Sequence, residues 1–168
     1  VTNNGDNSVT KLNSTNGSTI GTYSVGNGPL GVAVDASGNV WVTNWSSSSV
    51  TKLDSTGSII GTYSVGSGPQ GIAVDASGNV WVTNENDNSV TKLDSTGSII
   101  GTYSVGSGPL GVSIDASGNV WVANTYSNSV TKLSSTGSTI GTYSVGNNPY
   151  AFGDATGFAL QYFVLGRR

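Results

Sequence analysis

Short apolar runs separated by small polar residues recur along the chain at a fixed spacing. In the second copy these runs are GIAVD at 71–75, NVWVTN at 79–84, SVTKL at 89–93 and SIIGTYSV at 98–105. The runs are rich in valine, isoleucine, threonine and aromatic residues, and apolar positions alternate with polar ones, which is typical of β-strands. We therefore expect four short strands in each copy.

The segments between these runs predict tight antiparallel turns. DASGN separates the first two runs and DSTGS separates the last two, and both consist of residues that favour turns. Trp41, Trp81 and Trp121 are spaced by 40 residues. Four antiparallel strands in every 40 residues predict an all-β fold, a β-propeller with one blade per copy. A flat β-solenoid is the alternative, but its repeats are usually shorter, and no helical period is present.

The copies predict about four blades in a single domain that covers residues 1–168. Complete blades are expected at about 29–66, 69–106 and 109–146, and a split blade at 1–26 plus 149–165. Three arrangements fit this count: a closed four-bladed ring, two chains that form an eight-bladed ring, and the carboxyl-terminal portion of a larger propeller. The start at Val1 and the lack of methionine favour the third. Residues 154–165 fit a strand, which we favour, or a helix capped by Asp154.

Two recurring side-chain types have predicted roles within the blades. Tryptophans such as Trp81 and tyrosines such as Tyr63 are expected to pack between neighbouring blades, because both faces of a blade are covered in a propeller. The lysine of each SVTKL run, for example Lys52, is expected to be solvated or paired with an acid such as Asp54.

Composition excludes several classes of function. The chain has no cysteine and no histidine, so it lacks thiolate ligands, disulfides and the commonest general base. Its six lysines and arginines form no basic face, which argues against a nucleic-acid partner, and no apolar run is long enough to span a membrane. Asp35, Asp75 and Asp115 are assigned to the DASGN turns. Glu85 and Asp87 lie in a loop without the glycine and closing glutamate of an EF-hand. No catalytic residue, metal site or cofactor is predicted.

The motif GP-x-G-[VI]-[AS]-[VI]-DASGNVWV-[TA]-N, which begins at residues 28, 68 and 108, resembles the NHL-type repeat. It is similar in particular to the streptogramin lyase (virginiamycin B lyase)-like propellers, over residues 1 to about 149. The resemblance implies the propeller scaffold. It also implies a metal-assisted eliminating enzyme with a histidine base and an acidic metal ligand, but no residue of this chain can supply that base. A lyase whose histidine lies in blades absent from this chain therefore stands as the alternative function.

Differences between the copies concentrate in two places. One is the segment between the second and third strands, at 3–8, 44–49, 84–89 and 124–129, and the other is the residue after the repeated proline. Because strands alternate in direction, both places are expected at the same end of the ring, where loops on a rigid scaffold commonly bind partners. Unconstrained drift of surface loops is the alternative explanation. The predicted binding residues are Asn44, Trp45, Gln70, Asn84, Glu85, Asp87, Asn124, Tyr126 and Tyr150.

These observations favour a non-enzymatic binding or structural propeller. We expect it to be secreted or on a bacterial cell surface, and to present its variable loops to a protein or glycan partner. A homo-oligomer or an extracellular assembly also fits a rigid repeat of this kind.

Overall fold

A computed structural model describes residues 1–150, in which all regular elements are β-strands apart from two short 3₁₀ turns. The first sheet contains β1 (Thr2–Asn3), β2 (Ser8–Leu12) and β3 (Thr19–Ser24), with η1 (Asn4–Asp6) after β1. The second contains β4 (Pro29–Val34), β5 (Val40–Asn44), β6 (Ser49–Leu53) and β7 (Ile59–Ser64), with η2 (Trp45–Ser47) after β5. The third contains β8 (Pro69–Val74), β9 (Val80–Asn84), β10 (Ser89–Leu93) and β11 (Ile99–Ser104). The fourth contains β12 (Pro109–Ile114), β13 (Val120–Asn124), β14 (Ser129–Leu133) and β15 (Thr139–Ser144).

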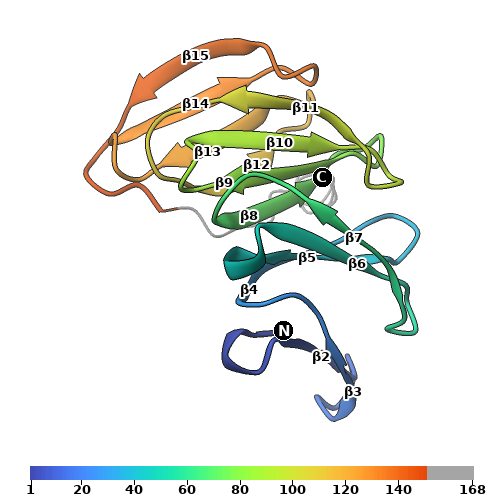
Figure 1. Ribbon diagram of the computed structural model, residues 1–168. Helices are drawn as coiled ribbons and strands as arrows, with labels where there is room; N and C mark the ends of the chain where they lie inside the picture. The colour runs from blue at the N-terminus through green and yellow to red at the C-terminus, as the bar shows by residue number, and fades with distance from the viewer. Residues whose placement is uncertain (151–168) are drawn as a thin grey trace, which may run out of the picture.

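All neighbouring strands within each sheet are antiparallel and follow the order of the chain, which confirms the predicted all-β fold built from antiparallel blades. Figure 1 shows the sheets following one another in an arc, and β4 contacts β8 while β8 contacts β12. The first sheet has three strands. The strand or helix predicted at 154–165, and with it most of the closing half of the split blade at 149–165, lies outside the described residues.

The second and third sheets each bury their tryptophan, Trp41 or Trp81, against the next sheet. Trp81 and Val90 of the third sheet form one apolar cluster with Val112, Val120 and Val122 of the fourth. Trp81 is 0% exposed, and its ring lies 5.8 Å from the ring of Tyr103, with an angle of 32° between the ring planes. The prediction that tryptophan and tyrosine pack between blades is therefore confirmed.

Polar side chains join the blades at the sheet interfaces. The hydroxyl of Thr83 accepts a hydrogen bond from the backbone N–H of Gly71 at 2.8 Å and donates one to the carbonyl oxygen of Leu110 in the next blade at 2.8 Å. Thr43 makes the same pair of contacts with Gly31 and Gln70. The repeated threonine thus ties the second strand of one blade to the first strand of the next.

The expectation that the repeated lysines are solvated or paired with an acid is wrong for Lys52 and Lys92, which are buried. The ammonium group of Lys52 donates to the carbonyl oxygen of Ser95 in the next blade at 2.8 Å and lies 4.6 Å from the centre of the Trp41 ring. The strand that carries Lys52, β6, is not a sheet edge, because it lies between β5 and β7. The Lys52 side chain also reaches the next blade, where it meets Ser95. A backbone carbonyl and an aromatic face therefore replace the solvent that we expected around the charge.

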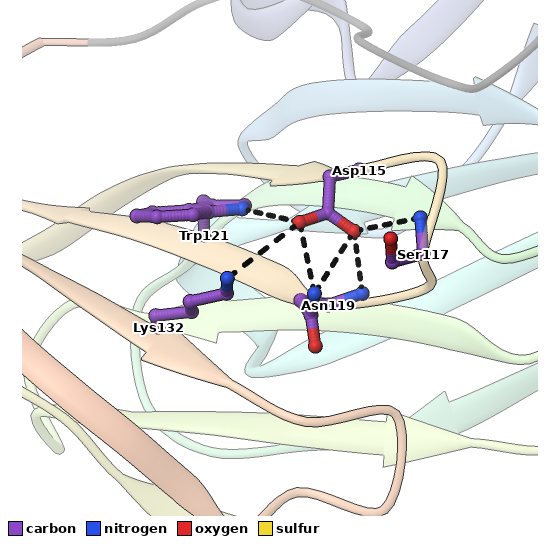
Figure 2. Close-up of polar contacts among 5 residues, drawn as sticks. All are labelled: Asp115, Ser117, Asn119, Trp121 and Lys132. Carbon is purple, nitrogen blue, oxygen red and sulfur yellow. Dashed lines mark hydrogen bonds and ion pairs between the residues drawn. The ribbon is translucent and has the colours of Figure 1, made fainter.

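The aspartates of the DASGN segments organise hairpin turns, as predicted. Figure 2 shows the carboxylate of Asp115 accepting hydrogen bonds from the backbone N–H groups of Ser117 and Asn119 and from the side chains of Asn119 and Trp121. The ammonium group of Lys132 lies 4.0 Å from the same carboxylate. Asp35 and Asp75 accept the corresponding hydrogen bonds from their turns and from Trp41 and Trp81. This aspartate is therefore fixed by its own turn and by the tryptophan of its blade.

These contacts predict a stability change in acid. Partial burial raises the pKa of Asp115, but the hydrogen bonds from Asn119, Trp121 and Ser117 outweigh it and lower the pKa to about 2 from an ordinary 3.8. A lowered pKa in the folded state means that the carboxylate stabilises the fold above pH 3.8 and loses this effect as the pH falls through about 2. We expect Asp115→Asn to be less stable than the parent near pH 6, and this difference to shrink between pH 4 and pH 2. Urea unfolding followed by circular dichroism measures it, and an equal difference at pH 6 and pH 2 would contradict this assignment.

Candidate binding site at the variable-loop end

The variable segments and the inter-blade linkers lie together at one end of the sheets. The backbone N–H of Glu85, directly after β9, donates to the carbonyl oxygen of Gly68 in the preceding linker at 2.9 Å. Trp45 and Gly28 make the same contact at 2.9 Å one blade earlier. We call this end, formed by residues 4–7, 45–48, 85–88 and 125–128 and the linkers 27–30, 67–70 and 107–110, the variable-loop end. The turns at 35–39, 75–79 and 115–119 and the turns at 54–58, 94–98 and 134–138 form the opposite, hairpin-turn end.

The loops share one backbone shape despite their different sequences. Each returns to the next strand through a residue in the left-handed conformation: Ser48 with φ of 48°, Asn88 with 50° and Asn128 with 49°. Asparagine adopts this conformation more readily than most residues. The side-chain oxygen of Asn88 also accepts a hydrogen bond from the backbone N–H of Gly108 at 2.9 Å. Asn128 makes the same contact with the backbone N–H of Asn148 at 2.9 Å, so these two loops are fixed against the next linker while their exposed side chains differ.

Three of the predicted binding residues converge on the carboxylate of a fourth, Glu85. Its Oε2 accepts hydrogen bonds from the indole Nε1 of Trp45 at 3.2 Å and from the amide Nε2 of Gln70 at 2.5 Å. Its Oε1 accepts one from the hydroxyl of Tyr126 at 2.6 Å. Trp45, Glu85 and Tyr126 come from the second, third and fourth sheets respectively. We call these four residues the Glu85 cluster.

The Glu85 carboxylate is held in its charged form. Partial burial raises the pKa of Glu85, but hydrogen bonds from Tyr126, Gln70 and Trp45 outweigh it and hold the pKa below its ordinary value. The hydrogen bond to Glu85 and the negative charge of that residue raise the pKa of the Tyr126 hydroxyl, with a smaller contribution from nearby Tyr150. The cluster therefore combines a carboxylate anion with a protonated phenol at neutral pH.

Aromatic rings around Glu85 remain accessible to a ligand. Trp45 is 39% exposed, Tyr126 is 65% exposed and Tyr150 is 59% exposed. Tyr126 rests on Gly108 of the linker, since a methyl group added there would overlap its ring, and Trp45 lies close to Gly68, where an added Cβ would be 3.1 Å from its Nε1. The rings are thus held in place from one side and open on the other, which is a suitable arrangement for stacking.

Four other residues of the predicted site have structural roles. Asn44, Asn84 and Asn124 are 0% exposed, and the side-chain amide of Asn84 donates to the hydroxyls of Ser89 and Thr91 within its own sheet. These asparagines are the last residues of β5, β9 and β13, and their side chains are buried within the sheets. We therefore leave all three out of the binding set. The carboxylate of Asp87 accepts a hydrogen bond from the backbone N–H of Ser67 at 2.6 Å, a position that a serine hydroxyl occupies in the neighbouring blades.

A groove that the sequence did not indicate lies between the first and second sheets. It has a volume of about 390 Å³, and its lining includes Val9, Tyr23, Val32, Val40 and Leu53. At the next two interfaces a buried tryptophan packs beside the corresponding tyrosine, Tyr63 or Tyr103. The groove lies at the interface between the first and second sheets, where no tryptophan of the described residues packs beside Tyr23.

Metal ligands and membrane-spanning helices are two further features that bear on the function of the variable-loop end. Within residues 1–150, no three acidic side chains come close enough together to hold a metal ion. The described part of the chain has no helix with the length and hydrophobicity that crossing a bilayer requires. The Glu85 cluster offers one anion, hydrogen-bonding groups and open rings, and these can bind and orient a ligand.

Comparison with solved structures finds the same fold in lyases. A streptogramin B lyase matches with a TM-score of 0.78 and 23% identity over 88% of this chain and 51% of that chain. A catalytically inactive virginiamycin B lyase from Staphylococcus aureus with quinupristin, in which alanine replaces a histidine, matches with a TM-score of 0.76 and 19% identity, over 84% and 50% of the two chains. Hydrazine synthase of Kuenenia stuttgartiensis matches with a TM-score of 0.69 and 25% identity, over 73% and 37%.

The chain therefore spans about half the length of the lyases that it matches. A comparison with curated protein sequences finds no match. The family model of the virginiamycin B lyase family matches residues 2–155, which include all four sheets and the Glu85 cluster. This chain belongs to the virginiamycin B lyase family.

Proposed function

We propose that this chain is a non-catalytic binding propeller that presents its variable-loop end to a protein or glycan partner outside the cell. The Glu85 cluster is the observation that carries the proposal. Trp45, Gln70 and Tyr126 are each found in only one copy of the repeat, yet all three donate to the same carboxylate. The low charge, the lack of cysteine and the abundance of serine, threonine and asparagine support an extracellular location.

This convergence argues against drift of unconstrained loops. Independent substitutions on different blades have no reason to place three donors of different types around one acceptor. The strands and turns that carry the loops are nearly identical from copy to copy, so the differences lie at the one end where they can meet a partner.

Family membership supports a second candidate, a lyase activity in a longer protein. In the related Staphylococcus aureus enzyme, replacement of one histidine by alanine gives a catalytically inactive protein. The 168 residues of this chain contain no histidine. Under this second candidate the essential histidine belongs to blades outside this sequence, and the variable-loop end contributes to substrate binding.

A double substitution tests the proposed function. We expect Trp45→Ala combined with Tyr126→Ala to weaken binding to any glycan or peptide identified on an array by at least about tenfold, because exposed rings of this kind dominate recognition surfaces. The variant should keep the parent circular dichroism spectrum, since both rings lie outside the sheet interfaces. Ser77→Ala with Ser117→Ala, at the hairpin-turn end, is the matched control and should bind as the parent does. Unchanged binding to every array hit by the double variant would overturn the proposal. Turnover of quinupristin by a longer protein that contains this chain and a histidine-bearing blade, with loss of turnover on replacement of that histidine, would overturn it in favour of the lyase.

A further inference from the structure

Within residues 1–150 the lysine side chains all lie toward the hairpin-turn end, together with the aspartates of its turns. Lys52 and Lys92 donate to the carbonyl oxygens of Ser95 and Ser135, which belong to turns at the hairpin-turn end. Lys11 and Lys132 lie at the same end, against Ser55 and Asp115. At the variable-loop end, the charged side chains within residues 1–150 are all acidic: Asp6, Glu85 and Asp87. This end therefore has a negative potential with no described lysine or arginine to neutralise it.

The charge of Glu85 is not compensated by its partners. Trp45, Gln70 and Tyr126 are neutral donors. A carboxylate can accept about four hydrogen bonds, two at each oxygen. Oε2 accepts from Trp45 and Gln70, whereas Oε1 accepts from Tyr126 alone, so one acceptor position on Oε1 remains for a ligand.

The same chain shows how this fold holds an ammonium group. In the fourth sheet the ammonium of Lys132 lies 4.6 Å from the centre of the Trp121 ring and 4.0 Å from the carboxylate of Asp115. That carboxylate also accepts the indole N–H of Trp121, and Tyr143 packs 6.0 Å from the same ring. An indole that donates to a carboxylate, with a tyrosine beside them, thus forms the environment of a lysine side chain.

The Glu85 cluster repeats these components without a lysine. Its indole, Trp45, donates to its carboxylate, Glu85, and its tyrosine, Tyr126, donates to the other oxygen. Both rings are partly exposed, so their faces are open to a ligand. A cation over an aromatic face is attracted by about 0.5–2 kcal/mol, and more so beside an anion.

We infer that the Glu85 cluster binds the ammonium group of a ligand, in contact with the Glu85 carboxylate and the Trp45 and Tyr126 rings. This inference rests on the proposed binding function and names the chemistry that the site selects. The ammonium can belong to a lysine side chain of a protein partner, which donates N–H to Glu85, or to a small quaternary ammonium compound such as choline, which offers its charge and methyl groups but no N–H.

The test compares a cation with a neutral molecule of the same shape. Choline and its neutral isostere 3,3-dimethylbutan-1-ol are titrated into the full chain labelled with ¹⁵N, and the indole N–H resonance of Trp45, assigned with Trp45→Phe, reports binding. We expect choline to bind at least about tenfold more tightly than the isostere, and less tightly as the salt concentration rises. A lysine-containing peptide and its Nε-acetylated form are titrated in the same way. Binding of the unmodified peptide alone indicates that a protein lysine, and not only a small ammonium compound, can supply the ammonium.

Glu85→Gln is the decisive variant, because it keeps an acceptor oxygen for the neighbouring donors and removes the charge. We expect it to weaken binding of choline or the lysine peptide at least about tenfold and to leave the isostere unchanged. Asp6→Asn, which removes one acid from the same end away from the rings, should change choline binding less than twofold. Equal binding of choline and the isostere, or equal losses in the two variants, would overturn the inference. If neutral glycans bind the parent chain but not the Trp45→Ala, Tyr126→Ala double variant, the ammonium inference is overturned and the proposed function still stands.

Discussion

Replacement of Trp81 by alanine is expected to destabilise the fold by about 4 kcal/mol, the usual cost of deleting a large aromatic side chain from a packed core. The ring is fully buried between the third and fourth sheets. Its indole N–H donates to Asp75 at 3.1 Å, and the ammonium of Lys92 lies 4.7 Å from its ring centre. The substitution therefore removes the packing of one interface, the aromatic face beside the Lys92 ammonium and one of the hydrogen bonds to Asp75.

Trp45→Ala is the matched control, because it deletes the same type of side chain from the surface of the neighbouring blade. We expect a loss below about 1 kcal/mol there, as is usual for exposed positions. Urea unfolding followed by circular dichroism gives both free energies. Similar losses for the two variants would mean that Trp81 does not lie between packed blades.

Gly97→Ala is expected to destabilise the fold by about 3 kcal/mol or more, from a positive φ combined with a steric overlap. Gly97 has a φ of +94°, and an added Cβ would lie 2.2 Å from Cε1 of Tyr63 in the preceding blade. Gly78→Ala is the control. It has a φ of +81°, but its Cβ would lie 3.7 Å from the nearest side chain, so we expect about 1 kcal/mol from the backbone alone.

Tyr63→Ala tests the origin of the difference. In that background Gly97→Ala should cost no more than Gly78→Ala does, since the overlapping ring is gone. Unfolding free energies of the single and double variants give this coupling directly. A cost for Gly97→Ala that is independent of Tyr63 would place the strain within the turn instead of between blades.

The scaffold can be predicted from the sequence because the same core and turn residues recur at the same positions in each copy. The 40-residue spacing of Trp41, Trp81 and Trp121 and the turn residues of DASGN defined the strands, the hairpins and the buried rings. Lysine was misjudged, because the charge of Lys52 is satisfied by a carbonyl oxygen and a ring that only the stacking of blades brings close. Periodicity within one blade carries no information about that neighbour.

The candidate site was predictable only as a set of positions. Variation between copies pointed to Trp45, Gln70, Glu85 and Tyr126, and the alternating strand direction indicated that they share one end. Their meeting at one carboxylate depends on the angle between blades and on side-chain rotamers, which the sequence does not give. Asn84 was included because it adjoins a variable loop, but strand alternation turns its side chain into the sheet.

The residues that are constant between copies lie between the blades, and the residues that vary lie at the variable-loop end. Threonine, lysine and tryptophan contacts repeat at successive interfaces and fix each blade on the next. Substitutions in the loops do not touch these contacts, so the loops can differ at little cost in stability. Stability and recognition are thus assigned to separate parts of each 40-residue copy.

Nuclear magnetic resonance mapping of a bound ligand on the ¹⁵N-labelled chain tests the central claim most directly, which is that recognition occurs at the variable-loop end around Glu85. Saturating choline, or an array hit, should shift backbone and indole resonances of residues 45–48, 67–70, 85–88 and 125–128. Resonances of the turns at 35–39, 75–79 and 115–119 should stay unchanged. Shifts concentrated in those turns, with the indole resonance of Trp45 unmoved, would contradict the claim.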